Sequence, residues 1–302
     1  MHTLRLDVRT WVLVLAAALT LVGCGGGNAG SAADALASQS DATRIENKGS
    51  DTIVNLALAW AEAYMQQHAD VRVSVTGGGS GTGIAALING TADLTNASRE
   101  MKPEEIAAAK KIGIEPVQHT IARDAIAVIV NPRNPINELT IPQLSDVFTG
   151  KITTWAELGG PDAPIVLLSR ESNSGTYAYF LENVVRRGDS KNTSLFSPET
   201  LLMPSSEGIS NEIRHNPNCI GYDGLGYVTP DQKTIRVSAG SGKPYVEPAI
   251  RTVENGTYPI SRGLYMYTAG APRSALKDYL SWIMGPDGQK IVTTLGFVPL
   301  AG

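Results

Sequence analysis

Apolar residues recur along this chain at two different spacings, which predicts that strands and helices alternate. In residues 53–67, Leu56, Trp60 and Tyr64 share one face of a helix, whereas residues 71–75 alternate apolar and polar positions as a strand does. Further strands are expected to end near residue 48 and to occupy residues 92–99, 114–130, 165–169, 220–228, 234–237 and 260–267. Further helices are expected at residues 84–90, 103–111, 141–148, 176–186, 210–215, 274–284 and 288–295. This order predicts an α/β fold in which helices flank mainly parallel sheets.

The first residues have the pattern of a lipoprotein signal peptide. Arg5 and Arg9 precede an apolar run of about 12 residues, which is too short to cross a bilayer of roughly 30 Å as a helix. The run ends in Leu21-Val-Gly-Cys24, which resembles the lipobox of bacterial lipoproteins and implies cleavage before Cys24 and acylation of that residue. We therefore expect residues 1–23 to be a signal peptide. An ordinary signal peptide followed by an unmodified cysteine is the alternative.

The residues after Cys24 are rich in glycine, alanine and serine, which favours a flexible linker over residues 24–43. The remaining part, about 260 residues, is long enough for one large or two medium domains. The only other cysteine is Cys219, so lipidation of Cys24 would exclude a disulfide within the chain. We expect Cys219 to be a buried thiol that packs as a small hydrophobic residue.

The formal net charge is −4 and no basic tract occurs, which argues against nucleic-acid binding. A net-negative protein that binds an anion needs local, oriented donors. Three segments supply them, each where a predicted strand gives way to a helix: Gly49-Ser-Asp-Thr52, Gly79-Ser-Gly-Thr-Gly83, and Arg170 with Ser174-Gly-Thr176. Helix N-termini add free N–H groups and a partial positive charge, and ligands of α/β sheets bind beyond the carboxyl ends of strands. The segments therefore predict a site for a tetrahedral oxyanion, with Arg170 as its positive charge.

Other kinds of site fit these segments less well. Residues 76–83 lack the Gly-Lys-Ser/Thr of a P-loop, and residues 81–86 fit a dinucleotide fingerprint only formally, because the helix after them is short. Neither Ser80 nor Ser174 lies in the Gly-x-Ser-x-Gly pattern of a nucleophile elbow. The four histidines are scattered without metal-ligand spacing. We expect no catalytic residue, metal or cofactor, and a purely structural glycine loop remains an alternative for residues 76–83.

From about residue 45 to the C-terminus, the chain resembles the periplasmic phosphate-binding proteins of high-affinity phosphate ABC transporters. Lys48-Gly-Ser-Asp-Thr52, Gly77-Gly-Gly-Ser-Gly81 and Arg170-x-x-x-Ser-Gly-Thr176 match the phosphate-binding segments of that family. Residues 139–155 and 258–262 are similar to the family as well. Each motif alone is modest, so the resemblance rests on their order and spacing together.

The resemblance implies a two-lobed periplasmic-binding-protein fold of type II, with the ligand in the cleft between the lobes. Lobe I would comprise residues 44–121 and 258–302, and lobe II residues 122–257, with crossings near Ile121 and residues 255–259. It also implies a monomeric, lipid-anchored protein in the periplasm or on the cell surface that captures inorganic phosphate and delivers it to an ABC transporter permease. A binding protein for another tetrahedral oxyanion such as sulfate is the first alternative. A phosphatase, a sensor or an adhesin on the same fold are others.

Carried over residue by residue, the resemblance implies that phosphate contacts Ser50, Asp51, Thr52, Ser80, Gly81, Ser98, Arg99, Arg170, Ser174, Gly175 and Thr176. Arg99 departs from the family pattern, because many members have an aspartate there that accepts the proton of hydrogen phosphate and so rejects sulfate. Asp51 is then a candidate acceptor, with Arg99 balancing its charge, since a buried carboxylate would repel a ligand without a proton. The alternative is that Asp51 caps the helix that follows it.

Overall fold

The computed structural model of the protein describes residues 42–300. The predicted signal peptide, Cys24 and nearly all of the predicted linker lie outside these residues. Between residues 42 and 300, no helix combines the length and the apolar character needed to cross a membrane.

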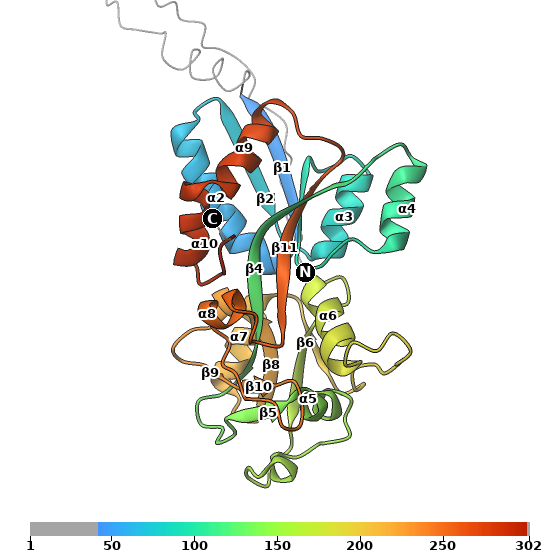
Figure 1. Ribbon diagram of the computed structural model, residues 1–302, viewed down its shortest axis with the longest axis vertical. Helices are drawn as coiled ribbons and strands as arrows, with labels where there is room; N and C mark the ends of the chain where they lie inside the picture. The colour runs from blue at the N-terminus through green and yellow to red at the C-terminus, as the bar shows by residue number, and fades with distance from the viewer. Residues whose placement is uncertain (1–41, 301–302) are drawn as a thin grey trace, which may run out of the picture. The chain divides into compact units, whose positions relative to one another are not determined.

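The first lobe combines the N-terminal elements with the C-terminal ones (Figure 1). Its strands are β1 (Thr43–Gly49), β2 (Val71–Thr76), β3 (Leu94–Ala97), β11 (Ser261–Thr268) and the first part of β4 (Val117–Val130). Its helices are α2 (Asp51–Gln67), α3 (Ser80–Ile88), α4 (Pro103–Lys111), α9 (Ser274–Met284) and α10 (Pro286–Thr294). Helices α2, α9 and α10 lie on one side of the sheet and α3 and α4 on the other (Figure 1). Trp60 belongs to the core under α2, and its indole N–H donates to the Gly288 carbonyl at 2.8 Å, which ties α2 to α10.

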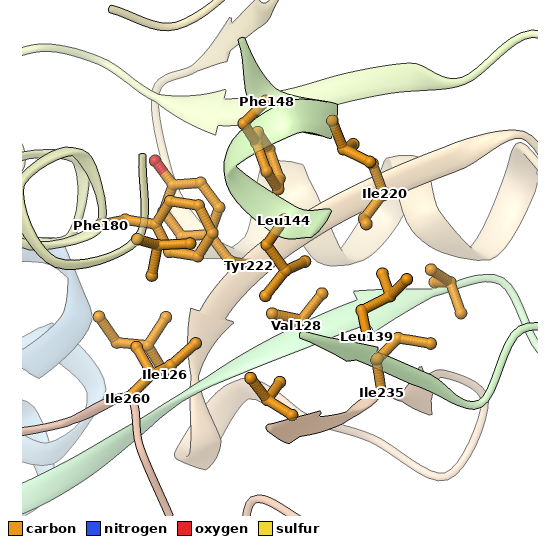
Figure 2. Packing of buried hydrophobic residues seen from close by; sticks show 14 of the residues in the cluster. Ile126, Val128, Leu139, Leu144, Phe148, Phe180, Ile220, Tyr222, Ile235 and Ile260 are labelled. Carbon is orange, nitrogen blue, oxygen red and sulfur yellow. The ribbon is translucent and has the colours of Figure 1, made fainter. Parts of the chain in front are cut away.

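The second lobe has its own sheet and core. Its strands are the end of β4 with β6 (Val166–Arg170), β7 (Leu201–Met203), β8 (Cys219–Gly224) and β9 (Lys233–Thr234), and a separate pair, β5 (Glu138–Thr140) and β10 (Arg236–Ser238). Its helices are α5 (Ile141–Phe148), α6 (Gly175–Phe180), α7 (Ser206–His215) and α8 (Ile250–Glu254). Figure 2 shows this core, where the rings of Phe180 and Tyr222 stack with centroids 3.7 Å apart. Such an aromatic pair contributes about 1 kcal/mol beyond its buried area, and it fixes α6 against β8.

Two long neighbouring strands, β4 and β11, connect the lobes (Figure 1). Along β4, Ile121 belongs to the first core and Ile126 to the second. Beside it, Leu264 of β11 belongs to the first core, and Ile260, just before β11, belongs to the second. The antiparallel ladder between the two strands shifts register between Leu264 and Tyr265, which marks a bulge. The chain therefore passes between cores as a paired ribbon.

The sheets match the predicted α/β class. In the first lobe, β2, β1, β3 and β4 all run one way and only β11 opposes them. In the second, β6, β7, β8 and β9 run one way and only β4 opposes them. Both sheets are thus mainly parallel, as predicted, with the opposing strand of each supplied by the connecting ribbon.

Three helices begin earlier than the hydrophobic pattern predicted. Helices α2, α3 and α7 start at residues 51, 80 and 206 rather than at 53, 84 and 210. Their first turns are built from Ser, Asp, Thr and Gly, which carry no apolar periodicity but supply the polar groups of a helix start. Asp51, Thr52, Ser80 and Gly81 therefore lie inside first helical turns, and Ser50 lies at the N-cap of α2.

Cys219 in β8 is buried, as predicted, and packs with Ile209 and Ile213. Burial, followed by the charge of Glu212, raises the pKa of its thiol to about 12. The thiol is therefore neutral at physiological pH and acts as a small hydrophobic side chain.

Candidate anion-binding site

The carboxyl ends of parallel strands in both lobes lead into helices that begin side by side. Helices α2, α3, α6 and α7 follow β1, β2, β6 and β7, respectively. The turn from β1 into α2 depends on Gly49, which has a φ of +142° and whose added Cβ would overlap the carbonyl oxygen of Asn96. Such helix starts present N–H groups and partial positive charge toward one region.

Three serine hydroxyls meet at this region. Ser50 Oγ donates to Ser98 Oγ at 2.9 Å, and Ser80 Oγ accepts from the Ser98 N–H at 3.0 Å while lying 3.3 Å from Ser98 Oγ. Gly175, the first residue of α6, faces them so closely that a Cβ there would overlap the hydroxyls of Ser80 and Ser98. All four residues are buried. The structure thus brings together predicted residues from three separate segments and from both lobes.

A threonine pair lies next to the serines and joins them to a second arginine. Thr52 Oγ1 and Thr176 Oγ1 are 2.7 Å apart, one from each lobe. Arg262 of β11 donates through Nη2 to Thr176 Oγ1 at 3.0 Å and through Nη1 to the Ser98 carbonyl at 2.9 Å. Its Nη2 also pairs with Asp124 Oδ2 at 2.9 Å, and both side chains are buried. Burial raises the pKa of Asp124, while the charge and hydrogen bonds of Arg262 oppose that rise.

Arg170 and Asp51 form an ion pair between the two lobes. Arg170 Nη2 lies 3.1 Å from Asp51 Oδ2, and the guanidinium also donates to Ser206 Oγ at 2.9 Å and to the Pro204 carbonyl at 3.1 Å. Asp51 Oδ2 accepts a further hydrogen bond from the Ser206 N–H at 2.8 Å. Asp51 therefore caps α7 of the opposite lobe, and within residues 42–300 it makes no capping bond to its own helix α2.

Arg99 has a different partner from the one expected. Its guanidinium binds Glu105 through two hydrogen bonds of 2.8 and 2.7 Å. Burial pushes the pKa of Glu105 upward, but the hydrogen bond and charge of Arg99 and the Lys102 N–H hold it below its ordinary value. The expectation that Arg99 balances the charge of Asp51 is therefore wrong, because Glu105 takes Arg99 and Arg170 takes Asp51. Contact of Arg99 with phosphate stays a prediction.

The two remaining predicted residues lie where loops of the lobes touch. Gly81 donates its N–H to the Asn173 carbonyl at 3.0 Å, and Asn173 Nδ2 donates to the Gly78 carbonyl at 2.9 Å. Ser174 Oγ accepts from the Thr176 N–H at 3.1 Å, so its side chain caps α6. These bonds fix the start of α6 over the serine cluster.

Sequence reasoning missed Asp124, Asn173, Ser206, Asp223 and Arg262 as members of this site. Asp124 interrupts an apolar run, and a charge inside a buried strand requires a partner, which was a usable signal. The start of α7 at Ser206 was also missed, because its first turn contains no apolar residue before Ile209. Among residues 42–300, no group of three His, Cys, Asp or Glu side chains is arranged to hold a metal ion.

Comparison with known proteins places this geometry in a family. A family model described as a PBP superfamily domain matches residues 36–287. The phosphate-binding protein PstS of Pseudomonas aeruginosa is 35% identical over 310 aligned positions, which cover 95% of this chain and 94% of that protein. The chain belongs to the PstS family of phosphate-binding proteins. Another PstS-family relative, from Bacillus subtilis, is 31% identical over 298 positions, covering 96% of this chain and 93% of that protein.

Solved structures agree with this family membership. A Clostridium perfringens protein, assigned as a phosphate ABC transporter substrate-binding protein and solved with bound phosphate, is 30% identical with a TM-score of 0.76. The match covers 86% of this PstS-family chain and all of that one. An ABC-type phosphate transport receptor from Vibrio cholerae is 26% identical with a TM-score of 0.68, covering 85% of this chain and all of that one. The predicted fold class and family are confirmed.

Proposed function

We propose that this PstS-family protein captures inorganic phosphate between its lobes, outside the cytoplasm, and delivers it to an ABC transporter permease. The observation that carries the proposal is the convergence of the Ser50, Ser80 and Ser98 hydroxyls on the start of α6, with Arg170 paired to Asp51, the residue after Ser50. Hydroxyl and N–H donors can replace the hydration shell of an oxyanion without a broad positive surface. The phosphate-bound structure from Clostridium perfringens supports the same ligand.

Phosphate entry requires the lobes to move apart. The three serine hydroxyls now bind one another within the first lobe, Thr52 and Thr176 bind each other between the lobes, and the lobes also touch at Gly175 and at Asn173. Phosphate oxygens would replace these hydroxyl partners one for one, so that closure around the ligand regains the bonds lost on opening. We propose the eleven predicted residues as its contacts, with Ser174 acting through the helix start that it caps.

Asp51 is the proposed acceptor of the phosphate proton. Its Oδ2 is taken by Arg170 and Ser206, whereas its Oδ1 makes no hydrogen bond to any residue between 42 and 300. Hydrogen phosphate can donate to that oxygen, but sulfate has no proton to donate and would face an unpaired carboxylate. Asp51 would therefore favour phosphate over sulfate.

The proposed protein has two lobes of defined bounds and a lipid anchor at its N-terminus. We propose lobe I as residues 44–121 and 258–302 and lobe II as 122–257. The change of core between Ile121 and Ile126 supports the first boundary, whereas Ile260 still packs in the second core and places the return crossing between Ile260 and Leu264. We also propose a monomeric transport protein without catalytic activity, anchored by lipid on Cys24 after removal of residues 1–23. Incorporation of labelled fatty acid into the native chain, but not into a Cys24→Ser variant, tests the anchor.

Calorimetric titration of ligand-stripped protein with phosphate and then sulfate tests the function. We expect one-to-one phosphate binding and no binding of sulfate. Arg170→Met should weaken phosphate binding by about a hundredfold or more, because a charged donor to the ligand is lost, whereas Arg44→Met, at an exposed site, should leave it unchanged. Equal binding of sulfate, or the same affinity in both variants, would contradict the proposal.

A further inference from the structure

Asp223 is a buried carboxylate behind the proposed site that no ligand contact explains. It lies in β8 and is fully buried. Its Oδ1 accepts from Ser206 Oγ and from the Gly224 N–H, both at 2.8 Å. Its Oδ2 is buried and finds no hydrogen-bond partner among residues 42–300. A buried carboxylate oxygen without a partner is costly when charged, and a proton on it removes that cost.

Ser206 connects Asp223 to the ion pair of the cleft. The hydroxyl of Ser206 accepts from Arg170 Nη1 at 2.9 Å and donates to Asp223, while its N–H donates to Asp51. One residue at the start of α7 thus touches three charged side chains. The position of the Arg170 guanidinium depends on this relay, because its remaining protein acceptors in the second lobe are main-chain carbonyls of residues 203 and 204.

Titratable groups on several elements surround Asp223, and Glu207 of α7 lies farther out, where it acts on Tyr227. Arg170 faces it from β6, Asp124 from β4 and Tyr227 from the turn after β8, and Asp51 of α2 lies beyond Arg170. Burial raises the pKa of Asp223 to about 7, in spite of the opposing charge of Arg170 and the Ser206 hydrogen bond, and with a further upward push from Asp124. The Asp223 carboxylate is therefore held in its charged form mainly by Arg170.

We propose that Asp223 positions Arg170 through Ser206 and takes up a proton at Oδ2 when phosphate binds in the cleft. This inference rests on the proposed function. The phosphate charge engages the guanidinium of Arg170, so Asp223 loses the counter-charge that kept it ionised and gains an anion nearby. The proton comes from solvent and converts the carboxylate into a neutral carboxyl, while Oδ1 keeps its bonds to Ser206 and Gly224.

Asp223 should take up a fraction of a proton when phosphate binds. With a pKa near 7, about a tenth of Asp223 is protonated at pH 8, and a rise of about one unit on binding makes that about a half. Binding should therefore take up about 0.4 proton at Asp223 near pH 8. Because uptake accompanies binding, this group makes phosphate affinity fall as pH rises above 7.

Calorimetry of the full-length protein with inorganic phosphate, in buffers of different ionisation enthalpy, counts protons taken up on binding. Phosphate itself titrates in this range, so the quantity of interest is the difference between the native chain and Asp223→Asn, in which an amide keeps the same shape. We expect the native chain to take up about 0.4 proton more than the variant near pH 8. Asp189→Asn, at an exposed site, should match the native chain.

Equal proton counts in the native chain and Asp223→Asn would overturn the inference. If the native chain binds no phosphate, the proposed function fails instead, so the two failures are distinguishable. Should Asp223→Asn not fold, infrared difference spectra of the native chain with and without phosphate give the same answer. A new protonated carboxyl band on binding is expected, and its absence refutes the proposal.

Discussion

Replacing Arg262 by methionine should destabilise the protein strongly, because it leaves Asp124 buried without its counter-charge. The guanidinium lies 2.9 Å from Asp124 Oδ2 and both side chains are almost inaccessible to solvent. It also donates to Ser98 and Thr176, so the substitution removes bonds that hold the cleft. Removing one partner of a buried pair costs about 3–5 kcal/mol.

Thermal and urea unfolding followed by circular dichroism measure this loss. A cost of that size lowers the melting temperature of a domain of this length by about 6–20 °C. The matched control is Arg251→Met, since Arg251 pairs with Glu247 at an exposed site where an ion pair is worth about 1 kcal/mol or less. Adding Asp124→Leu to Arg262→Met should restore most of the stability, because an apolar pair needs no counter-charge.

The pH dependence of the stability loss in Arg262→Met tests directly whether the unpaired charge of Asp124 causes it. In Arg262→Met, burial holds the folded-state pKa of Asp124 above its unfolded value. The penalty is therefore full above that raised pKa and fades as pH falls through it, since the protonated carboxyl is neutral. A deficit no larger than that of Arg251→Met, or one that does not shrink at lower pH, would refute the reasoning.

Three other substitutions test separate parts of the site. Asp51→Asn removes the proposed proton acceptor, so the ratio of phosphate to sulfate affinity in competition titrations should fall about tenfold or more; an unchanged ratio would deny Asp51 that role. Gly175→Ala adds a Cβ that overlaps the Ser80 hydroxyl, so equilibrium dialysis should show phosphate affinity reduced by about one to two orders of magnitude; native affinity would mean that α6 does not close on the ligand. Arg99→Leu frees Glu105, so the free energy of unfolding should fall by about 1 kcal/mol near pH 7. Because Arg99 lowers the Glu105 pKa, that difference should shrink as pH falls below the unfolded-state pKa and through the folded-state one, and urea titrations in which it does not decrease as pH is lowered would contradict the assignment.

The donor segments were predictable because their geometry is local. Hydroxyl and glycine residues between a strand and a helix become the first turn of that helix, and parallel strands end at a common edge. Ser50, Ser80 and Gly175 therefore meet as expected, although 125 positions separate the first from the last. The helix starts themselves were placed too late, because polar first turns carry no apolar period.

The partners of the charged residues were not predictable from pattern alone. Asp51 caps a helix 155 positions away, and Asp124 pairs with an arginine 138 positions away. Such pairs depend on how two lobes and two crossing strands pack, which no local spacing encodes. Arg99 pairs with Glu105, only six positions away, and not with Asp51. Glu105 is available to it because its bond to the Lys102 N–H holds the carboxylate at the start of α4.

The paired strands β4 and β11 make the connection between the lobes resistant to sliding but easy to bend and twist. Sliding one strand along the other would break the whole antiparallel ladder, whereas bending and twisting deform each bond only slightly. The bulge after Leu264 concentrates that bending at one level of the ribbon. Bending at one level would let the proposed opening and closing of the lobes follow a single path. The donors that separate lobes contribute, such as Thr52 and Thr176, would then return to the same relative positions on each closure.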